Sequence, residues 1–171
     1  MAVSEEKIKK LASLLEKDNP SLIVQAVERL REEEPFEGAV ALLASCYDRN
    51  HDVMVNRAIE TFFNDLKDKS ARSEVVGELK KEHKPHTVTM LASSCWQSGL
   101  DYSAFSIDFT EIFLKSDYGT ALECMTVIEE SIPVLTEKEK SRIKGMVGRS
   151  AEDETSPKKA LAIDLMEKLE S

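Results

Sequence analysis

Two of the three cysteines lie in stretches of the chain that share one pattern. "LLASCYDRNHDVMVNRAIETF" begins at Leu42, and "LASSCWQSGLDYSAFSIDFTE" begins forty-nine residues later, at Leu91. A duplicated cysteine nucleophile would need exposure and a neighbouring His or Lys that lowers the pKa of its thiol. Cys46 and Cys95 instead lie near the ends of apolar segments, as does Cys124 in "ALECMTVI". We therefore expect all three to be buried core residues, and the repeated stretch to be a structural unit.

The histidines and the clustered carboxylates favour neither catalysis nor metal binding. His83 and His86 are three residues apart, but Pro85 interrupts the helix that would bring both rings to one face. We expect a solvated polar turn there. The carboxylate runs at 32–34, 129–130 and 152–154 fall at expected helix ends and in loops, where water solvates them. The chain has no Gly-rich phosphate loop, GxSxG or HExxH motif, so the sequence predicts no catalytic residue, no metal and no cofactor.

One basic cluster lies between residues 138 and 149. On a helix, Lys138, Arg142 and Arg149 would share a face and could contact phosphates. Glutamates are interleaved with these cations, so an ordinary solvated face is the favoured interpretation. The alternative function, a nucleic-acid-associated helical-repeat protein, depends on this 138–149 ridge.

The composition limits the class of protein. The chain has 171 residues, 42% of them hydrophobic and 32% charged, and its formal net charge of −9 opposes non-specific binding to nucleic acid or anionic lipid. No apolar run approaches the roughly 20 residues of a membrane span, and the first ten residues are too charged for a signal peptide. Three scattered cysteines suit a reducing compartment. We expect an acidic, cytoplasmic protein without membrane association.

Apolar residues recur at helical spacing through almost the whole chain, and proline or capping residues separate the segments. Pro20 opens one segment, Asp52 and Asp101 are expected to cap later helices, and Thr136 begins a sequence with the spacing of a capping box. These breaks predict an all-α fold of about nine to ten helices. The helices are expected near residues 5–17, 20–33, 36–47, 52–66, 68–85, 86–97, 101–115, 118–130, 136–147 and 156–169.

Three segments resemble the second helix of a HEAT-type repeat: "DNPSLIVQAVERL" (18–30), "HDVMVNRAIETF" (51–62) and "SPKKALAIDLMEKL" (156–169). Each has Asp, Ser or Pro at the turn, then small residues, then Leu or Phe. The chain thus resembles the HEAT/armadillo-like superfamily over most of its length. It departs from that pattern where HEAT repeats often carry a basic residue, because Val24, Ala58 and Ile107 hold those positions. The resemblance implies a single domain over 1–171, an α-α superhelix of stacked helical hairpins.

The same resemblance implies a non-enzymatic scaffold that presents a concave surface to another protein or peptide. Residues on the second helices that point away from the apolar stripe, together with Trp96, are the expected partner-binding residues: Asn56, Glu60, Asn64, Trp96, Ser106 and Thr110. For Trp96 and its counterpart Tyr47 a core role is favoured over an interface role. An enzyme is a third class, since some helical-repeat proteins have acquired catalytic activity.

Overall fold

The computed structural model describes residues 2–33 and 35–171, and every regular element in these ranges is helical. The all-α prediction and the expected helix number are confirmed, since this described part contains ten α-helices and three short 3-10 helices. In chain order they are α1 (Ala2–Leu15), α2 (Pro20–Glu32), α3 (Ala39–Arg49), α4 (Val53–Asn64), η1 (Lys69–Ala71), α5 (Arg72–Leu79), α6 (Pro85–Gln97), η2 (Ser103–Phe105), α7 (Ser106–Lys115), α8 (Tyr118–Ser131), η3 (Ile132–Val134), α9 (Glu137–Glu152) and α10 (Lys159–Glu170).

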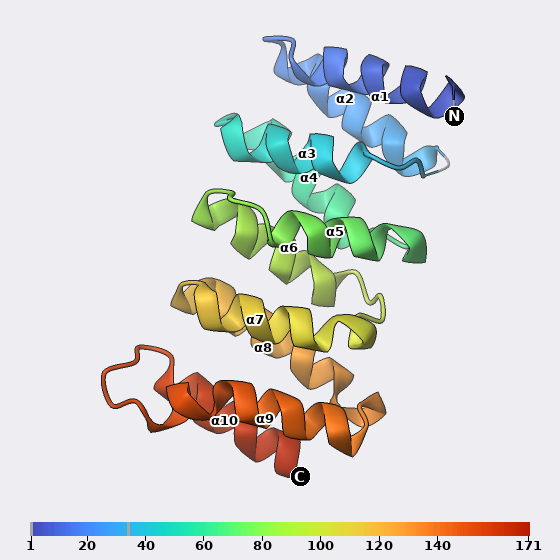
Figure 1. Cartoon of the computed structure of the whole chain (residues 1–171). Coiled ribbons are helices and arrows are strands. Elements are labelled where there is room, and N and C mark those ends of the chain that lie inside the picture. The colour runs from blue at the N-terminus through green and yellow to red at the C-terminus, as the bar shows by residue number, and fades with distance from the viewer. Residues whose placement is uncertain (1, 34) are drawn as a thin grey trace. The chain divides into compact units, whose positions relative to one another are not determined.

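The first compact unit, Met1–Ser98, holds α1 to α6 and is called the N-terminal unit below. Its odd-numbered helices pack in one row, α1 on α3 and α3 on α5, and its even-numbered helices pack in a second row, α2 on α4 and α4 on α6 (Figure 1). The core residues are almost fully buried, and burying each large apolar side chain contributes about 1.5–3 kcal/mol. They include Val27, Leu43, Val55, Ile59, Phe63 and Leu91.

The second compact unit, Gly99–Ser171, holds α7 to α10 and is called the C-terminal unit. It repeats the same packing, because α7 pairs with α8 and α9 with α10, while α7 also packs on α9 and α8 on α10. Its core contains Phe109, Phe113, Ile128, Ile143 and Leu165, all fully buried. The arrangement of both units into one superhelical domain stays a prediction.

Side-chain caps explain where several helices begin. The Asp52 carboxylate accepts hydrogen bonds from the amides of Met54 (2.9 Å) and Val55 (3.1 Å), as predicted. The capping box of Thr136 and Glu139 at the start of α9 is also confirmed. The prediction that Asp101 caps the helix ending at Lys115 is wrong. Its carboxylate accepts from the Ser103 amide (2.8 Å), so it closes a turn before η2, and α7 begins only at Ser106.

Two glycines adopt left-handed backbone conformations next to helix ends. Gly38 has φ +96° immediately before α3, and Gly99 has φ +70° just after α6. The sequence pattern predicted that this helix begins at residue 36. The left-handed conformation of Gly38 explains why α3 begins at Ala39 instead. A Cβ at Gly38 would also lie 3.1 Å from Cδ1 of Ile8. Glycine is therefore required at this junction.

Within residues 2–33 and 35–171, no helix combines the length and the apolar character that crossing a membrane requires.

Candidate functional site

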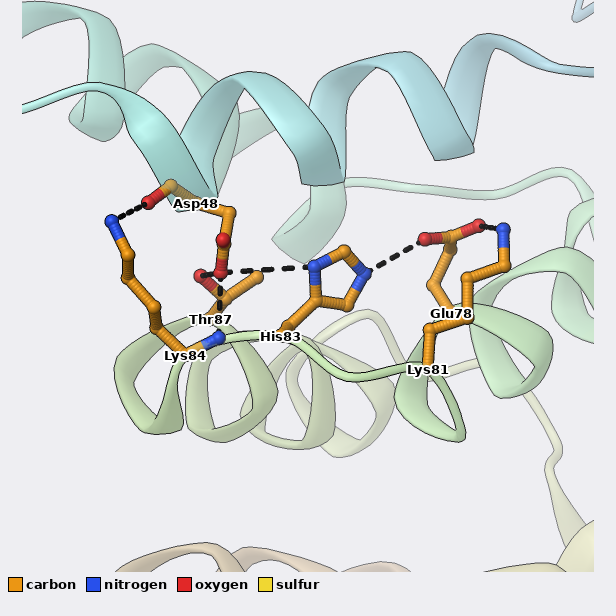
Figure 2. Close-up of polar contacts among 6 residues, drawn as sticks. All are labelled: Asp48, Glu78, Lys81, His83, Lys84 and Thr87. Carbon is orange, nitrogen blue, oxygen red and sulfur yellow. Dashed lines mark hydrogen bonds and ion pairs between the residues drawn. The ribbon is translucent and has the colours of Figure 1, made fainter.

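A cluster of polar side chains joins three helices of the N-terminal unit (Figure 2). Asp48 lies in the last turn of α3, and its Oδ1 accepts hydrogen bonds from the Lys84 amide (2.8 Å) and the Thr87 hydroxyl (2.7 Å) at the start of α6. His83, in the loop before α6, places Nδ1 3.7 Å from the same oxygen. We call this set the Asp48 cluster, and its members are Asp48, Glu78, Lys81, His83, Lys84 and Thr87.

Glu78, at the end of α5, completes the cluster from the other side of the imidazole. His83 Nε2 lies 2.9 Å from Glu78 Oε2, and Lys81 pairs with the second oxygen of Glu78. The side chains of Glu78 and His83 are only 5% and 9% exposed. The prediction of a solvated turn at His83 is therefore wrong, because this histidine lies between the nearby Glu78 carboxylate and that of Asp48, which is distant in sequence.

The electrostatics of the cluster favour an ionised Asp48. Burial by itself raises the pKa of this carboxyl, but the hydrogen bonds from Thr87 and Lys84 and the positive charges of His83 and Lys84 outweigh it. The net effect holds the pKa of Asp48 below its ordinary value. A carboxylate on α3 is thus fixed to the first turn of α6.

The geometry of the cluster suits a structural tie better than a catalytic site. A general base needs a ring nitrogen that faces a substrate, whereas both nitrogens of His83 face carboxylates of the protein. The nearest hydroxyl, that of Thr87, donates to Asp48. His86 points elsewhere, and its ring lies 5.5 Å from the ring of Tyr47. The cluster holds α3, α5 and α6 together.

The cysteines are where the sequence placed them. Cys46, Cys95 and Cys124 are all buried and free. Burial raises the pKa of the Cys46 thiol, and the charge of Arg49 opposes this only in part. A raised thiol pKa is the opposite of what a nucleophile requires. The interpretation of these residues as core is confirmed.

The six expected partner-binding residues do not form one exposed set. Ser106 and Thr110 are buried, and their hydroxyls donate to the carbonyls of Ser103 (2.7 Å) and Ser106 (2.8 Å) one turn earlier. The expectation that these two side chains point away from the core is therefore wrong. Trp96 is half-buried at the end of α6.

The other three expected residues lie on α4 and are half-buried. Glu60 accepts a hydrogen bond from the Tyr47 hydroxyl (2.7 Å), and the side-chain Nδ2 of Asn56 donates to the backbone carbonyl of Asn50 (3.2 Å). Asn64 lies at the end of the same helix. Two of the three are thus engaged within the protein, and their role in binding a partner stays a prediction.

The 138–149 ridge lies on α9 of the C-terminal unit. Lys138, Arg142 and Arg149 are exposed, as expected. Lys140, in the same helix, pairs with Glu137 at 3.2 Å. Lys158 does not extend this basic surface, because it is buried and donates hydrogen bonds to the end of α7.

A groove of about 1080 Å³ opens in the N-terminal unit where the ends of α2 and α4 meet the starts of α3 and α5. Its apolar lining residues, called the floor below, come from α2, α3, α4, η1 and the connecting loops: Leu30, Pro35, Phe36, Ala39, Val40, Phe62, Leu66 and Ala71. Acidic side chains dominate its polar lining: Glu28, Glu32, Glu33, Glu37, Asp65, Asp68 and Glu74. We call this feature the acidic groove.

Local structure holds the walls of the acidic groove in place. The Gly38 amide donates to Glu74 Oε2 (3.0 Å), which joins the loop before α3 to the first turn of α5. Arg31 on α2 pairs with Asp65 at the end of α4. Asp68 accepts from the amide of Ser70 (2.9 Å) and thereby begins η1.

The sequence interpretation found the acidic run at 32–34 and correctly placed Glu32 and Glu33 on the surface, while Glu34 lies outside the described residues. It missed that this run borders a groove. One feature of the sequence points there, namely an aromatic residue, Phe36, directly after a proline and amid glutamates. An apolar ring at such a polar break needs a surface to pack on.

Across the described part of the chain, no group of three or more His, Cys, Asp or Glu side chains is arranged to hold a metal ion. No family model, no curated protein and no solved structure matches this chain.

Proposed function

We propose that this chain is a non-enzymatic protein-interaction module and that the acidic groove receives a segment of its partner. The observation that supports this proposal is the composition of the groove, which joins an apolar floor to a polar rim in a volume of about 1080 Å³. Binding sites typically combine apolar lining with a few polar groups that orient the ligand. None of the six residues expected from the sequence lines this groove, so the proposed contact surface differs from the one predicted.

The packing of the N-terminal unit supports a binding role for this groove. Ala39, Val40 and Phe62 are buried at its base, so the floor belongs to the core and has a fixed shape. Leu30, Phe36 and Leu66 are half-buried and leave apolar surface within reach of a ligand. A partner side chain that covers this surface gains about 25 cal/mol per Å² of apolar area removed from water.

Photo-crosslinking at two matched serines tests the proposal. Ser73 is exposed on α5 and lines the groove, whereas Ser45 is exposed on α3 of the same unit and does not. A photoreactive residue introduced at position 73 should give a discrete adduct with one protein of a native-source lysate, and position 45 should not. Ser73→Arg should abolish capture of that protein by the unlabelled chain, and Ser45→Arg should leave it unchanged. Identical adducts from both positions, or capture that survives Ser73→Arg, would refute the proposal.

A further inference from the structure

The rim of the acidic groove carries far more negative than positive charge. Among the residues that the structure describes, seven carboxylates and two cations line it. Both cations already have partners, because Arg31 pairs with Asp65 and the Lys67 ammonium donates to the Ser98 carbonyl. The two cations offset only two of the seven carboxylates, so the described lining keeps a net negative charge.

Four of the carboxylates are available to a ligand. Glu28, Glu32, Glu33 and Glu37 are exposed, and none of their side chains has a hydrogen bond or an ion pair within the described part of the chain. Glu28 and Glu32 lie in the last turns of α2, and Glu33 and Glu37 lie in the loop that follows. Glu74 at the start of α5 also lines the groove, and its carboxylate accepts a hydrogen bond from the Gly38 amide (3.0 Å), directly after Glu37.

These charges act over the width of the groove. At about 0.1 M ionic strength the screening length is about 10 Å, so neighbouring lining carboxylates act together on the potential at a bound segment. A cleft lined by one sign of charge concentrates ligands of the opposite sign. Phosphate-bearing and acidic ligands are repelled by the same field. A ligand that fits both the floor and the rim must carry cationic and apolar groups together.

We infer that the occupant of the acidic groove is a cationic protein segment in which Leu or Phe side chains alternate with Lys or Arg. The apolar side chains pack on Phe36, Leu30 and Leu66, and the cationic side chains reach the carboxylates of Glu32 and Glu37. This inference rests on the proposed function and specifies the chemistry of the partner.

Fluorescence anisotropy with two synthetic peptides tests the inference. The probe is a fluorescein-labelled short peptide of Lys, Arg, Leu and Phe, and its counterpart has Glu in place of every Lys and Arg. The wild-type chain should bind the cationic peptide and not the acidic one. Raising NaCl to about 0.3 M should weaken binding about fivefold, because salt screens the rim charges. Failure to bind the cationic peptide at low salt would overturn the inference.

Two double variants separate the groove from the overall charge. Glu32→Lys/Glu37→Lys reverses two rim charges, and Glu167→Lys/Glu170→Lys makes the same change in net charge at exposed positions on α10. The groove variant should bind about tenfold more weakly, since each rim contact turns from attraction to repulsion, whereas the α10 variant should change less than about twofold. Equal weakening in both would show non-specific charge attraction and would overturn the inference. Far-UV circular dichroism checks that each variant retains its helices.

Ser73→Arg distinguishes this inference from the proposed function. If Ser73→Arg blocks capture of the protein partner while Glu32→Lys/Glu37→Lys does not weaken it, the groove binds a segment that is not cationic, and only the inference fails. If neither change affects capture, the proposed function fails as well. If both changes weaken it, the inference is supported.

Discussion

Lys158 fastens the segment before α10 to the end of α7, and replacing it by methionine tests how the C-terminal unit is held together. The residue is 8% exposed, and its ammonium donates to the carbonyls of Phe113 (2.7 Å), Leu114 (2.7 Å) and Ser116 (2.9 Å). The last carbonyls of a helix have no partner within that helix. One ammonium group therefore provides the donors that α7 itself cannot supply.

The expected cost of Lys158→Met follows from two opposing contributions. Hydrogen bonds from a charged group contribute about 1.5–3 kcal/mol each, so three give a gross gain of about 4.5–9 kcal/mol. Burying an ammonium group costs several kcal/mol, and burial indeed lowers the pKa of Lys158, although Asp117 and Cys124 oppose this. Methionine keeps the apolar stem and leaves the three carbonyls without that donor. We expect the free energy of unfolding to fall by about 2–4 kcal/mol.

Urea unfolding followed by far-UV circular dichroism measures this change. The single tryptophan, Trp96, lies in the N-terminal unit, whereas far-UV circular dichroism includes the signal of α7 to α10. Lys159→Met is the matched control, because Lys159 pairs with Glu154, which is 84% exposed, and such a pair contributes about 0–1 kcal/mol. If Lys158→Met is no more destabilising than Lys159→Met, the ammonium does not hold α7 and the reasoning is refuted.

Three further predictions concern other contacts. The folded-state pKa of Asp48 is lowered, so its stabilising contribution is complete above the unfolded-state value of about 3.9 and is lost as pH falls through the folded-state value. Asp48→Asn should accordingly lower the urea midpoint at pH 7 and show a shrinking difference towards pH 3; an equal difference at both pH values would contradict this. Thr136→Ala should cost about 1 kcal/mol in thermal unfolding and Thr136→Ser much less, because serine can still cap α9; equal losses would argue against the capping box. Cys46, Cys95 and Cys124 should not react with Ellman's reagent in the native state and should all react in urea, and rapid native reaction at any of them would show that it is accessible.

Features that depend on neighbours in sequence could be predicted. The Asp52 cap and the capping box at Thr136 join residues within one turn of each other. The number of helices follows from the spacing of apolar residues within each segment. Even here the local pattern left choices open. Asp101 matched Asp52 in the repeated stretch, yet a 3-10 turn at Ser103–Phe105 separates it from α7. An aspartate near a helix start can close a turn or cap the helix, and the sequence alone does not distinguish the two.

Features that depend on distant pairs could not be predicted. His83 was expected in water because its neighbours are Lys, Glu and Pro, but Asp48 on α3 encloses it from thirty-five residues away in the chain. Lys158 follows a polar stretch of the sequence, yet it is buried, because its ammonium donates to a carbonyl at the end of α7. The acidic groove forms where the ends of α2 and α4 meet the starts of α3 and α5, which are separate segments of the sequence. Each of these depends on how helices pack, which a pattern of residue types within one helix does not contain.

The left-handed turn at Gly38 has a consequence for how fast a partner can associate. Its amide already holds Glu74, and its φ of +96° disfavours any side chain, so this part of the acidic groove is ordered before a ligand arrives. A segment that enters then loses only its own conformational freedom. Association should therefore proceed in a single kinetic phase whose observed rate rises linearly with peptide concentration, without a plateau set by rearrangement of the loop.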